Sequence, residues 1–123
     1  MWEITLLGPV NDWYLQLCDD DPKTASNILD ALDLLAEVGP TLGRPAVDRI
    51  HRSRLHNLKE LRPGSSGGSE VRMLFVFDTQ REAIVLVAGD KSGRWSEWYE
   101  ESIPLAEARY ADYVEEQRKG ENA

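Results

Sequence analysis

Residues 55–91 read LHNLKELRPGSSGGSEVRMLFVFDTQREAIVLVAGDK and hold three apolar segments separated by turn-forming residues. Residues 55–62 have the half-polar pattern of a strand with one face toward water, and Pro63 ends it. Residues 70–78 and 83–89 are apolar on both faces, which is typical of central strands covered on both sides. We therefore predict three consecutive strands in the middle of the chain.

Two glycine-containing segments in this region resemble nucleotide-binding loops only superficially. GSSGGS at residues 64–69 lacks the GxGxxG pattern and the strand–loop–helix setting that such loops need. GDKSG at residues 89–93 lacks the upstream glycine of a phosphate-binding loop. The first segment is interpreted as a mobile connection between two strands.

The flanking segments predict one more strand and three helices. Residues 2–7 alternate between apolar and polar side chains, which indicates a strand. Apolar residues at helical spacing then follow Pro9 and predict a first helix. A second helix is expected over residues 22–38, with Asp21 as its N-cap rather than as a metal ligand. A final helix is expected from Ser102.

Residues 41–54 are irregular and basic, so we expect a surface connector there. The charged tail from about residue 115 is expected to fray. The predicted order is β-α-α-β-β-β-α within a single domain of residues 1–123. This order indicates an α+β fold in which a small antiparallel sheet is packed by helices on one face, while the other face stays partly open and carries cations.

The charge of the chain is distributed unevenly along the sequence. The net charge is −8, which argues at first against a nucleic-acid partner. Residues 44–94, however, hold ten Lys and Arg against six acids. Residues 1–43 hold one cation against eight acids, and residues 95–123 hold three against eight. A basic middle region predicts a phosphate-rich partner. The alternative is that both flanking regions are solvated acidic helix faces and that the positive and negative charges of the middle region merely balance, without forming a binding site.

Localisation signals and metal-binding patterns are missing from the sequence. No apolar run approaches the roughly 20 residues that span a bilayer, so no membrane association is expected. Met1 is not followed by a basic segment, which argues against secretion. Cys18 cannot form an internal disulfide, fits a cytoplasmic protein, and is interpreted as a small apolar residue rather than a nucleophile. His51 and His56 are spaced unfavourably for a shared metal, and we expect neither metal nor cofactor.

Five cations stand at or near the ends of the predicted strands: Lys59, Arg62, Arg72, Lys91 and Arg94. Arg72 is the exception in an otherwise apolar strand. A buried charge is costly, so Arg72 must reach an acid or an open cleft. Arg72 either pairs with Glu60 on the neighbouring strand or lines a phosphate site, and strand geometry allows both at once.

Three aromatic residues follow the last predicted strand. Trp95, Trp98 and Tyr99 lie close in sequence to Lys91 and Arg94. Aromatic side chains beside cations can stack the bases of single-stranded nucleic acid. The alternative is packing on the core, which we expect for at least one of the two tryptophans.

The segments LKELRPG, EVRMLFVFD and AIVLVAGDKSGRWSEWY resemble the RelE/ParE-like toxins of bacterial toxin–antitoxin modules, and most closely their HigB-like, phage Gp49-like branch. The resemblance implies a ribosome-dependent mRNA endoribonuclease that inhibits translation and needs no metal. It also implies neutralisation by a small helix-turn-helix, HigA-like antitoxin, through which alone the toxin would contact operator DNA.

The resemblance also implies which residues act. The catalytic candidates are Lys59, Arg62, Arg72, Asp90, Lys91 and Tyr99, and the RNA-binding candidates are His56, Arg94 and Trp95. Cleavage by a 2′-OH needs a base, an acid for the leaving oxygen, and cations for the anionic transition state.

Arginine suits the charge-stabilising role, because a guanidinium grips two phosphate oxygens. Lys59 or Lys91 can be the base only if nearby cations depress its pKa. Asp90 and His56 are alternative bases, and Tyr99 could orient or stack a base.

Two features depart from the usual pattern of these nucleases. The chain is acidic overall, and Glu60 lies between Lys59 and Arg62, where relatives often keep a cation. Two other functions therefore stay open. The chain could be a non-enzymatic, ParE-like inhibitor of a gyrase-type protein target, or an inactive module that only binds its antitoxin.

Overall fold

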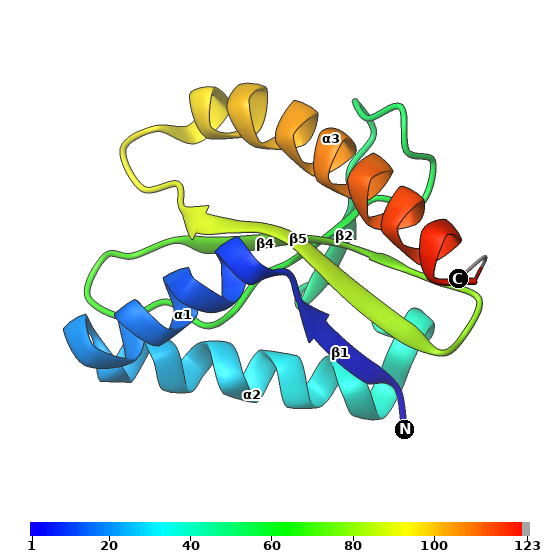
Figure 1. The fold of residues 1–123 in the computed structure, drawn as a ribbon. Coiled ribbons are helices and arrows are strands. Elements are labelled where there is room, and N and C mark those ends of the chain that lie inside the picture. The colour runs from blue at the N-terminus through cyan, green and yellow to red at the C-terminus, as the bar shows by residue number, and fades with distance from the viewer. Residues whose placement is uncertain (122–123) are drawn as a thin grey trace.

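The computed structural model describes residues 1–121 as one five-stranded sheet with helices on both faces (Figure 1). The sheet order is β1-β5-β4-β3-β2. In chain order the elements are β1 (Glu3–Leu6), α1 (Gly8–Asp20), α2 (Pro22–Val38), the 3-10 turn η1 (Gly39–Thr41), β2 (Val47–Arg49), β3 (Lys59–Leu61), β4 (Val71–Phe77), β5 (Glu82–Asp90) and α3 (Trp95–Glu121).

The α+β class is confirmed, and the architecture is compatible with a RelE-like fold. Three details of the expected arrangement are wrong. The sheet is mixed rather than antiparallel, because β1 pairs in parallel with β5. The segment expected to be an irregular connector contains β2, an edge strand paired antiparallel to β3. The helices cover both faces instead of one.

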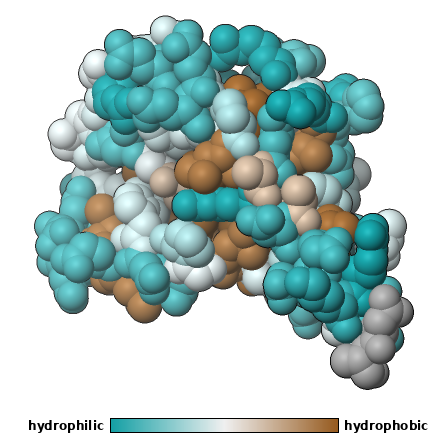
Figure 2. Space-filling model, turned by 45° about the horizontal axis from the view of Figure 1, so that its top comes forward, coloured by the Kyte–Doolittle hydropathy of each residue, from teal (hydrophilic) through white to brown (hydrophobic). Residues whose placement is uncertain are grey.

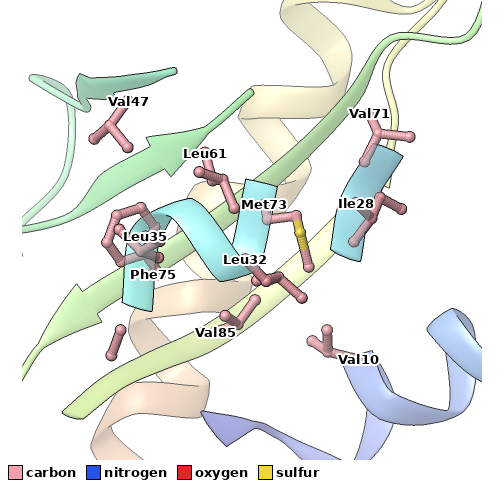
Figure 3. Packing of buried hydrophobic residues seen from close by; sticks show 11 residues of the cluster. Val10, Ile28, Leu32, Leu35, Val47, Leu61, Val71, Met73, Phe75 and Val85 are labelled. Atoms are coloured by element: carbon pink, nitrogen blue, oxygen red, sulfur yellow. The ribbon is translucent and has the colours of Figure 1, made fainter. Parts of the chain in front are cut away.

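Alternation along the central strands builds a core on each side of the sheet. Met73 and Phe75 point toward α1 and α2, where they meet Ile28 and Leu35 (Figure 3). Leu74 and the alternate residues point to the other side, against α3. A strand whose side chains are apolar on both faces needs cover on both faces, and the structure supplies it.

The α2 helix confirms its predicted bounds. The Asp21 carboxylate accepts hydrogen bonds from the Thr24 backbone N–H at 3.2 Å and from the Thr24 hydroxyl at 2.6 Å, so the expected N-cap is present. Gly39 ends the helix with a φ of 73°. These local signals explain why the bounds of α2 could be predicted correctly from the sequence.

The α3 helix begins at Trp95, earlier than the expected start at Ser102, and extends to Glu121. Its first turn forms because the Trp95 N–H donates to the Lys91 carbonyl, directly after a tight turn at Gly93 with a φ of 74°. The aromatic residues that follow β5 therefore lie on a helix packed against the sheet.

The face on the α3 side is mainly hydrophilic. Figure 2, in which the α3 side comes forward, shows hydrophilic side chains over most of this face and an apolar patch in its middle. Within residues 1–121, no helix combines the length and the apolar character that crossing a membrane requires.

Candidate functional site

Four of the predicted site residues gather at one end of the sheet, on its α3 side. Arg72 lies on β4, Arg62 directly follows β3, and Lys91 directly follows β5. Strands β3, β4 and β5 are neighbours in the sheet, so these three cations come from adjacent strands. Tyr99, on the second turn of α3, lies over them and is within electrostatic reach of Arg62 and Arg72.

Glu60 occupies the centre of this cluster. Its side chain is only 3% exposed, and its Oε1 lies 2.7 Å from Nε of Arg62 and 3.5 Å from Nε of Arg72. The pairing of Arg72 with Glu60 that the sequence suggested is therefore present. Sequence reasoning treated Glu60 as a departure from the family pattern, whereas the structure makes it the shared partner of both arginines.

Asp48 is a member of the cluster that sequence reasoning missed. Its Oδ2 lies 3.2 Å from Nη2 of Arg62, so Arg62 bridges two carboxylates. Asp48 lies on β2, in register with Glu60 on β3. The omission follows from the missed strand, because only the β2–β3 pairing places this acid beside the site.

Arg72 has unused hydrogen-bonding capacity. Its side chain is 16% exposed, and Nη1 donates to the Val71 carbonyl at 2.8 Å. Its Nε is fully buried and makes no hydrogen bond within the described part of the chain. The anion that faces this donor is the Glu60 carboxylate, at a distance longer than a good hydrogen bond, so the pairing of Arg72 is electrostatic and its Nε hydrogen bond is not formed.

Tyr99 is held as a neutral phenol. The pKa of Tyr99 is raised to about 12. The largest cause is burial, and the smaller causes are the hydrogen bond to the Glu60 carboxylate and the negative charge of that carboxylate. The nearby Arg72 opposes this effect only in part. At physiological pH the Tyr99 hydroxyl therefore carries its proton and can donate it, and it does not serve as a base.

Lys91 connects the cluster to the aromatic residues of α3. Its side chain is buried, its Nζ lies 3.5 Å from the Glu70 carboxylate, and it lies 3.8 Å from the ring centroid of Trp95 and 5.6 Å from that of Tyr99. The base role considered for Lys91 depends on neighbouring cations, but the charged group that contacts it is an acid.

The two tryptophans after β5 differ in exposure: Trp98 is buried and Trp95 is exposed. Trp98 is buried at 5% exposure and packs on the α3 side of the core, which confirms that at least one tryptophan is a core residue. Trp95 is 59% exposed, with Lys91 over its ring. Only Trp95 therefore presents a wide aromatic surface to solvent.

A hollow of about 320 Å³ opens beside Glu60, Arg62 and Tyr99; we call it the site hollow. Its other wall is the end of β2, which contributes Arg49, and the segment after β2, which contributes His51 and Arg52. Sequence reasoning placed these basic residues on a surface connector without assigning them a role. The number of basic residues within a few positions was the available signal, but only the folded chain brings them into one hollow with Tyr99.

Lys59 and Arg94 lie apart from the site hollow. Lys59 points to the opposite face of the sheet, where its Nζ donates to the Pro40 carbonyl at 3.4 Å and lies 5.4 Å from the Phe77 ring centroid. Adjacent residues of a strand face opposite sides, so Lys59 cannot share the face of its neighbour Glu60. Arg94 pairs with Glu101 at 2.6 Å on the exposed start of α3.

Asp90 and His56 also lie outside the cluster. The Asp90 carboxylate accepts backbone hydrogen bonds from Glu70 at 3.0 Å and from Ser92 at 2.9 Å. Burial alone would raise the pKa of Asp90, but these hydrogen bonds outweigh it and hold the pKa below its ordinary value. Asp90 therefore organises the turn after β5. His56 is exposed in a turn, and its carbonyl accepts from Arg49 at 3.4 Å.

Comparison with known proteins places this sequence in a family. Residues 16–111 match the model of the phage-derived protein Gp49-like family, DUF891. The chain belongs to this family.

Two relatives from Mycobacterium tuberculosis (strain ATCC 25618 / H37Rv) are similar to this Gp49-like chain. One, named "Putative toxin HigB3", is 42% identical over 117 residues, which cover 95% of this chain and 97% of the relative. The other, named "Putative toxin HigB2", is 50% identical over 94 residues, which cover 76% of this chain and 47% of the relative. The HigB-like, Gp49-like resemblance is thereby confirmed.

Proposed function

We propose that this Gp49-like chain, as the toxin of a toxin–antitoxin module, cleaves mRNA at the ribosome without a metal and so stops translation and growth. A helix-turn-helix, HigA-like antitoxin would neutralise it. Family membership and the names of the relatives support the toxin assignment. The nuclease activity is supported by one observation: Arg62 and Tyr99 line a hollow with a basic wall, while Arg72 and Lys91 lie next to Tyr99 without lining that hollow.

The proposed reaction is attack of a 2′-OH on the adjacent phosphorus. The bond from phosphorus to the 5′ oxygen breaks, and a 2′,3′-cyclic phosphate and a free 5′-OH are produced. Arg62 and Arg72 would stabilise the extra negative charge on the phosphorane oxygens. Tyr99 has a pKa of about 12 and is therefore protonated at physiological pH. It would give that proton to the leaving 5′ oxygen.

His51 is our candidate for the general base. Among the groups considered from sequence, Lys59 and His56 lie away from the site hollow and Asp90 is engaged by two backbone N–H groups. His51 lines the same hollow as Tyr99, and an imidazole there would accept the proton of the 2′-OH.

The test is induction of the chain in a bacterial host, followed by primer extension on ribosome-bound mRNA. We expect discrete breaks with the natural sequence and a loss of cleavage of at least about 100-fold with Arg72→Ala. Lys23→Ala, which removes an exposed cation on α2 outside the site hollow, is the matched control and should cleave normally. Full toxicity of Arg72→Ala would contradict the assignment.

A second candidate function is inhibition by protein binding. The acidic α1–α2 hairpin exposes Leu15, Leu29 and Leu34 at 55%, 49% and 41%, and exposed apolar residues of this kind favour a protein partner. Growth arrest with intact transcripts in the same primer-extension experiment would support this function and exclude the nuclease.

A further inference from the structure

A second hollow, of about 230 Å³, adjoins the site hollow. The two share Arg52, Tyr99 and Ile103, so Tyr99 is a common wall. The volume is below the ~300–1,000 Å³ of typical small-molecule pockets. A strand of RNA with its phosphate in the site hollow would therefore find room for one neighbouring base here.

The walls of this second hollow are suited to a flat ring. Ile103 and Pro104 of α3 supply apolar surface, and Tyr99 supplies an aromatic side chain. Arg52 and Arg54 stand on the opposite wall, where they can attract the phosphates that flank a bound base. These features together match a nucleotide within a chain better than a free anion.

The polar groups on the α3 side of this hollow are acceptors. Pro104 lies inside the helix and has no N–H, so the Glu100 carbonyl lacks its ordinary helical donor. Glu100 also carries an exposed carboxylate, for which the described residues provide no ion pair. Glu100 and Pro104 both line the second hollow and are one helical turn apart, so the Glu100 carbonyl without its helical donor lies on this side of α3 and adds to the acceptors there.

Glu107 completes the acceptor set and fixes the opposite wall. Its Oε2 accepts from the Ser53 hydroxyl at 2.9 Å and from the Arg54 backbone N–H at 2.6 Å, which ties the loop after β2 to α3. Its Oε1 has a looser partner, Nε of Arg54 at 3.7 Å. The hollow is thus held open between two anchored segments.

We infer that this second hollow binds the nucleobase beside the scissile phosphate and selects bases with an exocyclic amino group, namely adenine, cytosine and guanine, over uracil. The inference rests on the proposed RNA cleavage. An exocyclic amino group donates to carboxylate and carbonyl oxygens. Uracil presents one ring N–H between two carbonyl oxygens, which would face the acceptors of Glu100 and Glu107.

The test is an NMR titration of the full chain with the four nucleoside 5′-monophosphates, observing the backbone amides of residues 99–107. We expect AMP, CMP and GMP to bind at least about fivefold more tightly than UMP. Glu100→Ala and Pro104→Ala should each reduce this ratio, because the first removes the carboxylate and the second restores the donor to the Glu100 carbonyl. Alanine is favoured in helices, so Pro104→Ala should keep the fold, and a thermal melt verifies it.

Glu97→Ala removes one charge from the same helix outside both hollows and should leave the ratio unchanged. Equal binding of all four monophosphates, or a ratio that survives both variants, would overturn base selection. Primer extension distinguishes failure of base selection from failure of the proposed nuclease activity. Cleavage without base preference would support the nuclease activity and contradict base selection by the second hollow. Base-selective binding with intact mRNA would support base selection and contradict the nuclease activity.

Discussion

Glu60 balances the charge of the site. The three cations Arg62, Arg72 and Lys91 face the carboxylates of Glu60, Asp48 and Glu70, so the cluster has no net positive charge. A phosphodiester must therefore compete with internal carboxylates for the guanidinium groups. This competition gives a physical meaning to Glu60, the acid that the sequence analysis treated as a departure from the family pattern.

Replacing Glu60 by Gln should increase RNA affinity severalfold, because one buried negative charge beside two guanidinium groups is removed. The stability cost should be about 1–3 kcal/mol, since the arginines lose a charged partner. Fluorescence anisotropy with a 2′-O-methyl RNA, which cannot be cleaved, measures the affinity. Asp30→Asn on exposed α2 is the control, and weaker binding by Glu60→Gln would mean that the carboxylate positions the arginines.

Tyr99 makes folding stability sensitive to alkaline pH. Its pKa is raised from 10.0 to about 12 in the folded chain, so the folded state keeps a proton that the unfolded chain releases in this window. The free energy of unfolding should be unaffected below pH 10 and should fall as pH rises toward 12. The full shift corresponds to ~2.7 kcal/mol, and partial solvation of the phenol reduces the expected effect to ~1 kcal/mol.

Urea denaturation between pH 9 and pH 11 compares the natural chain with Tyr99→Phe, since the window opens near the ordinary tyrosine value of 10.0. The variant should lose less stability across this range. Tyr14 and Tyr113 also have raised pKa values and remain in both proteins, so the difference isolates Tyr99. Identical pH profiles would show that Tyr99 does not exchange its proton in this way.

At the level of elements, the site depends on where α3 begins. A Cβ added to Gly89 on β5 would lie 2.7 Å from Nε1 of Trp98, so the missing side chain lets the helix approach the sheet. Tyr99 follows Trp98 directly, which means that the packing of Trp98 on Gly89 also sets the position of the phenol.

Gly89→Ala should therefore cost about 1–3 kcal/mol of stability, because the buried indole cannot move freely. It should also lower RNA cleavage through displacement of Tyr99. Thermal unfolding and primer extension measure the two effects. Gly43→Ala, where nothing lies within 4 Å of the added carbon, is the matched control. Unchanged stability of Gly89→Ala would show that Trp98 can rearrange.

The sequence predicted some elements well and others poorly, for local reasons. The second helix has an N-cap, a proline in its first turn and a Gly-Pro stop, and its bounds were predicted correctly. The strand β2 has only three residues, too few to show alternation, so it was missed together with Asp48. The start of α3 was placed too late because Ser102 and Pro104 have the pattern of a helix N-terminus.

For the whole molecule, residues 70–78 are apolar on both faces, and this pattern correctly predicted that helices cover both faces of the sheet. The separate expectation that one face stays open was wrong. Arg62 lies at the margin between α3 and the segment after β2, and Arg72 and Lys91 are largely buried near Tyr99, so these cations do not stand on a bare sheet. Pairing between distant segments decides this arrangement, and single-sequence patterns do not encode it directly.

The basic residues around the two hollows should dominate RNA binding despite the net charge of −8. Screening limits exposed charges to about 8 Å at physiological salt, so the acids of α2, on the other face of the sheet, should matter little. Removing Arg52 and Arg54 together should lower affinity and flatten its dependence on salt, by about 0.7 in log–log slope for each phosphate that the variant no longer binds.

Anisotropy titrations over a range of KCl concentrations measure this slope. The control is the double variant Asp30→Asn, Glu37→Gln, which should change affinity by less than about twofold at physiological salt. A larger effect from these distant acids than from the two arginines would contradict local steering.

The parallel pairing of β1 with β5 has a consequence during synthesis. Within residues 1–121, β1 (Glu3–Leu6) pairs only with β5 (Glu82–Asp90), and Tyr99 follows later in the chain on α3. In a nascent chain the β1 edge therefore stays unpaired, and the cluster stays unassembled, until β5 and the first turns of α3 have left the ribosome. The site through which we propose that the protein stops translation thus forms only after Tyr99, the last member of its cluster, has been synthesised.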